Sequence, residues 1–303
     1  GKLCAIDGAA NAAAPAPMFG AAMREHFLLS SDYTFLNHGA FGSPCRASFE
    51  AAASWREHTE AQPLAFIDRQ LFAHLVESAR QVAALVGAPL ADLVLVANAT
   101  TALHVAVNAA CVSANLQQHD EVLLLDVGYG SVGKMAARAC EGKGAVVTTV
   151  QLLPDFPLAA QPEEVLARVA AAITPRTKVA IFDHVTSNTA VHLPITELTQ
   201  LCRSHGVLSV VDGAHSLGSV ASSLALGTLG ADFFCGNLHK WVCNARGSAF
   251  LYVRPSSGGA AAATAGLKVE PPVISHGYRA GGLASGFIWQ GASDYSPLLA
   301  VPV

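Results

Sequence analysis

The sequence predicts an α/β fold in which one large domain is built on a mostly parallel sheet. Short runs rich in aliphatic and β-branched residues alternate with longer segments of helical periodicity, the pattern of parallel strands connected by helices. The composition is 52% hydrophobic and 13% charged, which excludes a disordered chain and suits strands buried on both faces. A chain of 303 residues can bury one large core and carry smaller pieces outside it.

The alternation predicts a series of strands and helices. The strands are Leu93–Ala97, Glu121–Asp126, Ala145–Val150, Val179–Phe182, Leu208–Asp212, Phe233–Cys235 and Ser248–Val253. The helices between them are Thr100–Ala110, Ser131–Glu141, Pro162–Ile173 and Ile195–His205. Gly206 follows the last of these helices, where glycine commonly caps a C-terminus. Repeated strand–helix–strand order favours a mixed sheet with mainly parallel neighbours.

Composition also separates parts of the chain. Residues 1–30 are Ala/Pro-rich and weakly patterned, so they are predicted to be an N-terminal arm or the remainder of a targeting segment. Residues 31–290 form the predicted large domain. Within it, Pro255–Gly266 is rich in Ser, Gly and Ala, which predicts a surface loop.

Charge and hydropathy exclude several kinds of partner. A net charge of −4 provides no basic surface for nucleic acid or an anionic membrane. No uninterrupted apolar run reaches the roughly 20 residues of a membrane helix. The seven cysteines are scattered without a Cys-x-x-Cys pair, so no metal site is predicted. We expect a soluble intracellular protein, of the cytoplasm or an organelle.

Lys240 lies in the most informative segment, GADFFCGNLHKWVCNARGSAFLYV, between a predicted strand and a second apolar run. Apolar neighbours lower the pKa of an amine, and a neutral amine is what carbonyl chemistry requires. Taken alone, a lysine at a strand end is more often an exposed surface residue. The case for Lys240 therefore depends on the segments that accompany it.

Asp212 ends the predicted buried strand in LSVVDGAHSLGS, and His215 follows three residues later. Side chains at the carboxyl ends of parallel strands face the ligand crevice of an open α/β sheet. A carboxylate there can pair with a ring nitrogen and keep it protonated, and His215 can donate to a ring oxygen. The alternative for Asp212 is a turn or capping residue.

A third segment, VANATTALHVAV, places Asn98-Ala99-Thr100-Thr101 where a strand ends and a helix begins. Free backbone N–H groups and the helix dipole make such a turn an anion site, to which threonine hydroxyls add donors. An ordinary Asn or Thr helix cap explains the same residue types.

Together these segments resemble the class V, fold-type I pyridoxal-phosphate enzymes, particularly the branch with isopenicillin N epimerase and cysteine-desulfurase-like proteins. The resemblance runs from about Tyr33 to the end of the chain. FLNHGAFGSP is similar to the family's N-terminal signature, NATTAL to its phosphate-binding turn, VDGAHS to its Asp-plus-His/Gln element and NLHKW to its Schiff-base lysine motif. The resemblance implies a fold-type I large domain with pyridoxal 5'-phosphate as cofactor.

The motifs also imply roles for single residues. Lys240 would be the Schiff-base lysine and the catalytic base, Asp212 would lie at the pyridine nitrogen, and His215 would lie near the phenolic oxygen of the ring. The phosphate would be held by Thr100, Thr101 and Asn237.

Further positions match by their place in the chain. Tyr129 stands where the family places a ring-stacking aromatic or His, after the strand VLLLD. Ser187 and Asn188, in HVTSNTAVHLP, occupy the family's polar position near the ring, without a choice between them. His38 is expected to line the substrate side.

The resemblance implies an enzyme that acts at Cα of an amino acid, as an epimerase or a C–S/β-elimination lyase. It also implies a homodimer, because the family builds its site at a subunit interface. The motifs do not separate epimerisation, elimination and desulfuration. Desulfurases of this type use a Cys in the C-terminal part of the chain, which is absent from this sequence and disfavours that activity.

Residues 291–303 are predicted to be the start of a smaller C-terminal domain that is truncated or missing, because family members carry one. In the family that domain supplies an Arg for the substrate carboxylate. Ala292 stands where the family usually has Thr. The alternative is a catalytically impaired binding or regulatory protein with the same fold, or a fragment.

GYGSVG, from Gly128 to Gly133, supports a more remote alternative, a nucleotide-binding protein. Extended by Lys134 it approaches a P-loop, but Met135 stands where Ser or Thr would bind magnesium. The dinucleotide interpretation needs a first strand and an acidic residue at a later strand end. Asp155 instead follows Leu-Leu-Pro, so this alternative is disfavoured.

Overall fold

One mixed sheet runs through the computed structural model, which describes residues 19–220, 224–255 and 266–301. The strand order is β1-β7-β6-β5-β4-β2-β3. The strands are β1 (Leu93–Val96), β2 (Glu121–Leu125), β3 (Val146–Val150), β4 (Thr177–Asp183), β5 (Leu208–Asp212), β6 (Phe233–Asn237) and β7 (Ala249–Val253). β7 is antiparallel to both β1 and β6, and the other pairs are parallel. The carboxyl ends of β1 to β6 therefore lie along one edge, and the predicted mostly parallel sheet is confirmed.

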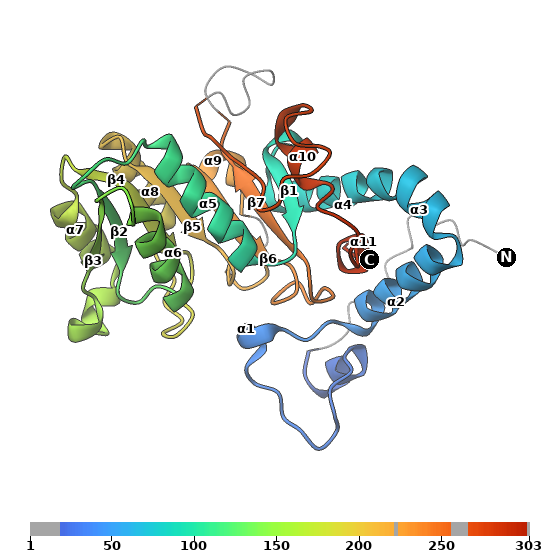
Figure 1. The fold of residues 1–303 in the computed structure, drawn as a ribbon. Coiled ribbons are helices and arrows are strands. Elements are labelled where there is room, and N and C mark those ends of the chain that lie inside the picture. The colour runs from blue at the N-terminus through green and yellow to red at the C-terminus, as the bar shows by residue number, and fades with distance from the viewer. Residues whose placement is uncertain (1–18, 221–223, 256–265, 302–303) are drawn as a thin grey trace.

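Helices cover both faces of this sheet (Figure 1). The α-helices of the described residues, on these faces and beside the sheet, are α1 (His38–Phe41), α2 (Arg46–Ala61), α3 (Pro63–Arg69), α4 (Leu71–Val86), α5 (Ala99–Ser113), α6 (Gly130–Cys140), α7 (Pro162–Ala172), α8 (Ile195–Ser204), α9 (Leu226–Leu229), α10 (Gly282–Phe287) and α11 (Ser296–Leu299). α5 and α6 pack on one face and α4, α7 and α8 on the other.

Side chains of β6 alternate between these two cores. Phe233 and Cys235 join the cluster under α5 and α6, whereas Phe234 joins the opposite cluster. Since neighbouring strand residues point to opposite faces, a strand covered on both sides is apolar throughout. α5 lies against the sheet through a row of alanines, Ala102, Ala106 and Ala110, which allows close approach.

The predicted elements after residue 92 are all present, and their ends agree with the structure to within three residues. Gly206 has φ +68, as a C-terminal cap requires. The helices α2, α3 and α4 were missing from the predicted set. α2 buries only Ser48 and Ala52, so its sequence lacks the wide apolar stripe by which helices are recognised.

Two predicted segments lie partly outside the described residues, the arm over 1–18 and the loop over 256–265. The rest of the arm contains a 3₁₀ helix at Ala21–His26. Leu299 of α11 packs on Leu71 and Leu75 of α4. Within the ranges that the structure describes, no helix combines the length and apolar character needed to cross a membrane.

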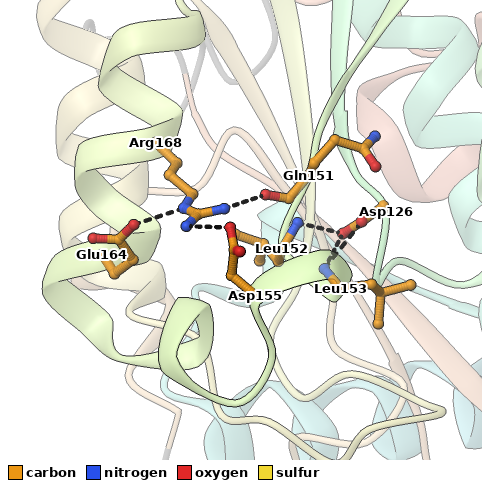
Figure 2. A network of polar contacts seen from close by, with 7 residues as sticks. All are labelled: Asp126, Gln151, Leu152, Leu153, Asp155, Glu164 and Arg168. Atoms are coloured by element: carbon orange, nitrogen blue, oxygen red, sulfur yellow. Dashed lines mark hydrogen bonds and ion pairs between the residues drawn. The ribbon is translucent and has the colours of Figure 1, made fainter.

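The loop after β3 is held in place by two acidic residues and one arginine (Figure 2). Asp126, directly after β2, accepts hydrogen bonds from the N–H groups of Leu152 (2.8 Å) and Leu153 (3.1 Å). Arg168 Nη2 of α7 forms an ion pair of 2.8 Å with Asp155 Oδ2. The carboxylate that a dinucleotide ribose would need is therefore paired within the chain, which further disfavours the nucleotide alternative.

Candidate active site

The carboxyl edge of the sheet gathers the predicted cofactor residues. Asp183 and Asp212 end the neighbouring strands β4 and β5 and are partners in register. Asn237 ends β6, and its Oδ1 accepts a hydrogen bond of 2.9 Å from the N–H of Ala99, the first residue of α5. This bond ties the segment that leads to Lys240 to the N-terminus of α5, so two of the predicted motifs meet at one place.

Lys240 is held by His215, and His215 is held by Trp241. The indole N–H of Trp241 donates to His215 Nδ1 (3.3 Å), and His215 Nε2 lies 2.9 Å from Lys240 Nζ. An indole nitrogen only donates, so a neutral His215 carries its proton on Nε2. That N–H points at Lys240 Nζ, an arrangement that an uncharged amine accepts.

The pKa values of both groups agree with this proton arrangement. Burial lowers the pKa of Lys240, opposed by the charges of Asp212 and Asp183. Burial, followed by the charge of Lys240, lowers the pKa of His215 to about 4. Near neutral pH the imidazole is therefore uncharged, and desolvation favours the neutral amine that carbonyl chemistry needs.

Asp212 is buried, with 5% of its surface exposed. Its Oδ1 accepts a hydrogen bond of 2.9 Å from the N–H of Ala214. Burial raises the pKa of this carboxyl, while the Ala214 N–H and the charge of Lys240 act in the opposite direction. A cation placed against Asp212 would compensate its desolvation, which is what a protonated ring nitrogen supplies.

Asp183 is a second buried carboxyl at this edge, and the sequence analysis did not select it. The predicted strand ended at Phe182, whereas β4 extends to Asp183. The signal that selected Asp212, an acidic residue at the carboxyl end of a buried strand, applies equally to Asp183.

Some hydrogen-bond donors of the turn before α5 already have partners within the chain. Asn98 Oδ1 accepts hydrogen bonds from the N–H (2.8 Å) and the hydroxyl (3.1 Å) of Thr101. Among the described contacts, the N–H and hydroxyl of Thr100 have no partner, and the Thr100 side chain is exposed. Thr101 donates to the helix cap, Thr100 and the amide nitrogen of Asn237 have no partner among the described contacts, and the phosphate contacts of Thr100, Thr101 and Asn237 stay predictions.

Replacing Asn98 by Ala is expected to lower the free energy of unfolding by about 1 kcal/mol, because the first turn of α5 loses its side-chain acceptor. Urea denaturation of the two proteins measures the difference. Asn108→Ala is a matched control in the same helix, because within the described ranges its exposed side chain hydrogen-bonds only to His104. Equal stabilities of parent and Asn98→Ala would show that the cap contributes nothing.

Three other predicted residues lie on loops at the same edge. Tyr129 precedes α6 directly and is 45% exposed. Ser187 and Asn188 lie in the turn that follows β4, with Ser187 partly buried and Asn188 exposed. The contacts of these side chains do not choose between Ser187 and Asn188, and their roles stay predictions.

His38 faces the Lys240 loop. Its Nε2 donates a hydrogen bond of 2.8 Å to the backbone oxygen of Lys240, and its ring lies 5.6 Å from the Trp241 ring. Gly42 has φ +69, and a Cβ there would lie 1.8 Å from the His239 oxygen. The FLNHGAFGSP segment thus packs directly on the NLHKW segment, and its glycine permits the approach. Lining of the substrate side by His38 stays a prediction.

Sequence comparison matches residues 66–279 to the family described as Aminotransferase class-V. Isopenicillin N epimerase of Streptomyces clavuligerus is 34% identical over 232 residues, which cover 77% of this chain and 56% of that protein. The probable chloroplastic L-cysteine desulfhydrase of Arabidopsis thaliana is 34% identical over 282 residues, 89% of this chain and 57% of that protein. The chain spans about half the length of the curated relatives it matches.

Solved structures agree on the fold. A mutant of C-DES with glycine covalently linked to the PLP cofactor aligns with a TM-score of 0.71 and 22% identity, over 92% of this chain and 72% of that chain. The cysteine desulfurase CsdA of Escherichia coli aligns with a TM-score of 0.68 and 18% identity, over 92% and 69% of the two chains. The predicted fold-type I architecture is confirmed, and with the sequence match above, the chain belongs to the class-V aminotransferase family.

Proposed function

We propose that this chain binds pyridoxal 5'-phosphate at the carboxyl edge of its sheet and acts at Cα of an amino acid. The observation that carries the proposal is the arrangement around Lys240. A partly buried amine with a lowered pKa lies 2.9 Å from the Nε2 of a neutral imidazole, near two buried carboxyls. An aldehyde reacts with an uncharged amine, and a protonated ring nitrogen pairs with a carboxylate.

The residues present fit this cofactor. Lys240 Nζ is the amine for its aldehyde, and Asp212 is a buried acceptor for its ring nitrogen. The phosphate would meet Thr100 and the Asn237 amide at the N-terminus of α5, where N–H groups and the helix dipole favour an anion. His215 Nε2–H is available to a ring oxygen once Lys240 has reacted, and Tyr129 supplies an aromatic face.

When bound, the cofactor supplies an electron sink for negative charge developing at Cα. The chain's own residues supply the proton chemistry. Lys240 Nζ would take the Cα proton, and partial burial, which lowers its pKa, suits it to this role. His215 holds Nζ through the tautomer that Trp241 selects. Asp212 would hold the ring nitrogen of the cofactor through its negative charge.

The reaction we propose is epimerisation, or elimination of a sulfur-bearing β-substituent. Relatives at 34% identity include an isopenicillin N epimerase and a probable L-cysteine desulfhydrase. Both reactions begin with removal of the Cα proton, the step that Lys240 is placed to perform. They differ in whether the proton returns to Cα or the β-substituent leaves. The alternative is a chain that binds the cofactor and turns over no amino acid.

A homodimer is the proposed assembly. Leu36 and Phe41 flank His38 and expose 89% and 75% of their surfaces, and Phe19 exposes 99%. Large apolar side chains exposed together on one segment mark an interaction surface. The segment that contacts Lys240 would therefore also contact a second copy. Sedimentation analysis measures this, and a monomer at micromolar concentration contradicts it.

The test of the reaction is exchange of the Cα hydrogen in deuterium oxide. We expect cofactor-loaded protein to exchange the Cα hydrogen of L-cysteine or a close analogue, because proton removal is common to both reactions. Sulfide release indicates elimination, and formation of the D-isomer indicates epimerisation. Cofactor binding without any exchange across a panel of amino acids would support the non-catalytic alternative.

A further inference from the structure

Asp183 joins two loops to the end of β4. Its side chain is 5% exposed, and its Oδ1 accepts a hydrogen bond of 3.4 Å from the N–H of Tyr129. The backbone N–H of Ser187 also lies close enough to this carboxyl to act on its pKa, in the lowering direction. Tyr129 belongs to the β2–α6 loop, and Ser187 belongs to the turn after β4. One carboxyl therefore holds the backbone of both segments that carry predicted ring contacts.

The chain also packs closely on Asp183. A Cβ built on Gly128 would lie 3.6 Å from Asp183 Oδ1 and 3.1 Å from the oxygen of Leu125. The loop before Tyr129 thus runs directly over the carboxyl. Its position depends on Asp183 in two ways, through the hydrogen bond and through packing.

Asp183 and Asp212 are neighbouring buried carboxyls. Their strands are adjacent and in register. The ionisable groups around Asp183 are Asp212 on β5, Lys240 after β6 and, through Lys240, His215. Burial, followed by the negative charge of Asp212, raises the pKa of Asp183 to about 8. The N–H groups of Tyr129 and Ser187 and the positive charge of Lys240 act in the lowering direction. With a pKa of about 8, Asp183 holds its proton near neutral pH, beside the carboxyl at the end of the adjacent strand.

We propose that Asp183 is a positioning residue of the cofactor site, which fixes the Tyr129 and Ser187 loops and leaves the single negative charge of the carboxyl pair to Asp212. This inference rests on the proposed function for the identity of the ligand. Asp183 would affect the cofactor indirectly, by holding the backbone of the two loops and by leaving the negative charge on Asp212.

Two substitutions separate the two parts of this role. Asp183→Asn keeps an acceptor for the Tyr129 and Ser187 N–H groups, and Asp183→Ala removes it. We expect the affinity for pyridoxal phosphate, followed by absorbance titration, to fall about tenfold in Asp183→Ala and to change less than about threefold in Asp183→Asn. Asp92→Asn, a buried carboxyl just before β1, is the matched control and should bind as the parent does. Parent-like affinity of Asp183→Ala overturns the positioning role.

The protein without cofactor tests whether Asp183 holds its proton. Because the pKa of Asp183 is raised from 3.8 to about 8 on folding, its contribution to stability is fully present below pH 4 and is lost as the pH rises toward 8. Asn does not ionise, so Asp183→Asn should gain melting temperature relative to the parent between pH 5 and pH 9. A difference that is constant over this range overturns the proton assignment.

The outcomes separate this inference from the proposed function. A parent that does not bind pyridoxal phosphate contradicts the proposed function, and the pH profile of the cofactor-free protein still tests the carboxyl pair. A parent that binds the cofactor, together with an Asp183→Ala variant that binds equally well, contradicts the inference alone.

Discussion

Lys240→Ala is expected to abolish the covalent link to pyridoxal phosphate and to lower Cα hydrogen exchange by about 10²- to 10⁴-fold, the usual contribution of a positioned base. No other described amine lies against His215, so no group takes over the proton. The absorbance of protein mixed with the cofactor and then desalted measures the first effect. Deuterium exchange at Cα of the amino acid measures the second.

The control for this substitution is Lys178→Ala. Lys178 is the second residue of β4, at the end of the strand opposite to Asp183, and its Nζ hydrogen-bonds only to the oxygen of Pro175 among described residues. The Lys178→Ala variant should retain the cofactor absorbance and the Cα hydrogen exchange rate of the parent. Covalent cofactor retained by Lys240→Ala would assign the chemistry to another amine and contradict the account of the site.

Asp212→Asn is expected to preserve cofactor binding while slowing Cα exchange about ten- to a hundredfold. The reason is that a neutral amide replaces a charge-assisted hydrogen bond to the ring nitrogen, a difference of about 1.5–3 kcal/mol. Burial of Asp212 makes the effect large, because water does not screen the charge. Exchange rates at saturating cofactor separate this loss from weaker binding.

A matched comparison uses Asp92→Asn, in which a buried carboxyl outside the site is changed in the same way. That variant should exchange at the parent rate. If Asp212→Asn also exchanges at the parent rate, Asp212 is a turn residue whose carboxyl serves only the Ala214 N–H.

The sequence was most informative where a local pattern and a tertiary position coincide. β5 ends at Asp212 as predicted, because a buried strand that meets the ligand edge changes from apolar to polar at its last residue. Asp183 was missed although it has the same pattern, since one residue decided whether it belonged to the strand or the loop.

Contacts between distant segments were not predictable in the same way. The Trp241–His215 hydrogen bond joins residues 26 positions apart, and no periodicity predicts which nitrogen of an imidazole meets an indole. The helix α2 was not predicted, because only a narrow face of it is buried and its sequence shows no clear apolar stripe. Asn98 accepts hydrogen bonds from the N–H and the hydroxyl of Thr101, a capping contact that the residue types alone did not separate from a phosphate site, and the phosphate role of Thr101 stays a prediction.

Reduction with borohydride tests the central claim most directly. Borohydride reduces the carbon–nitrogen double bond that an amine forms with an aldehyde, and this fixes the cofactor to the residue that holds it. Peptide mass mapping of the parent, loaded with pyridoxal phosphate and reduced, should find the pyridoxyl group on the peptide that contains Lys240. Label on another lysine, or no label at all, would contradict the assignment of Lys240 as the cofactor lysine.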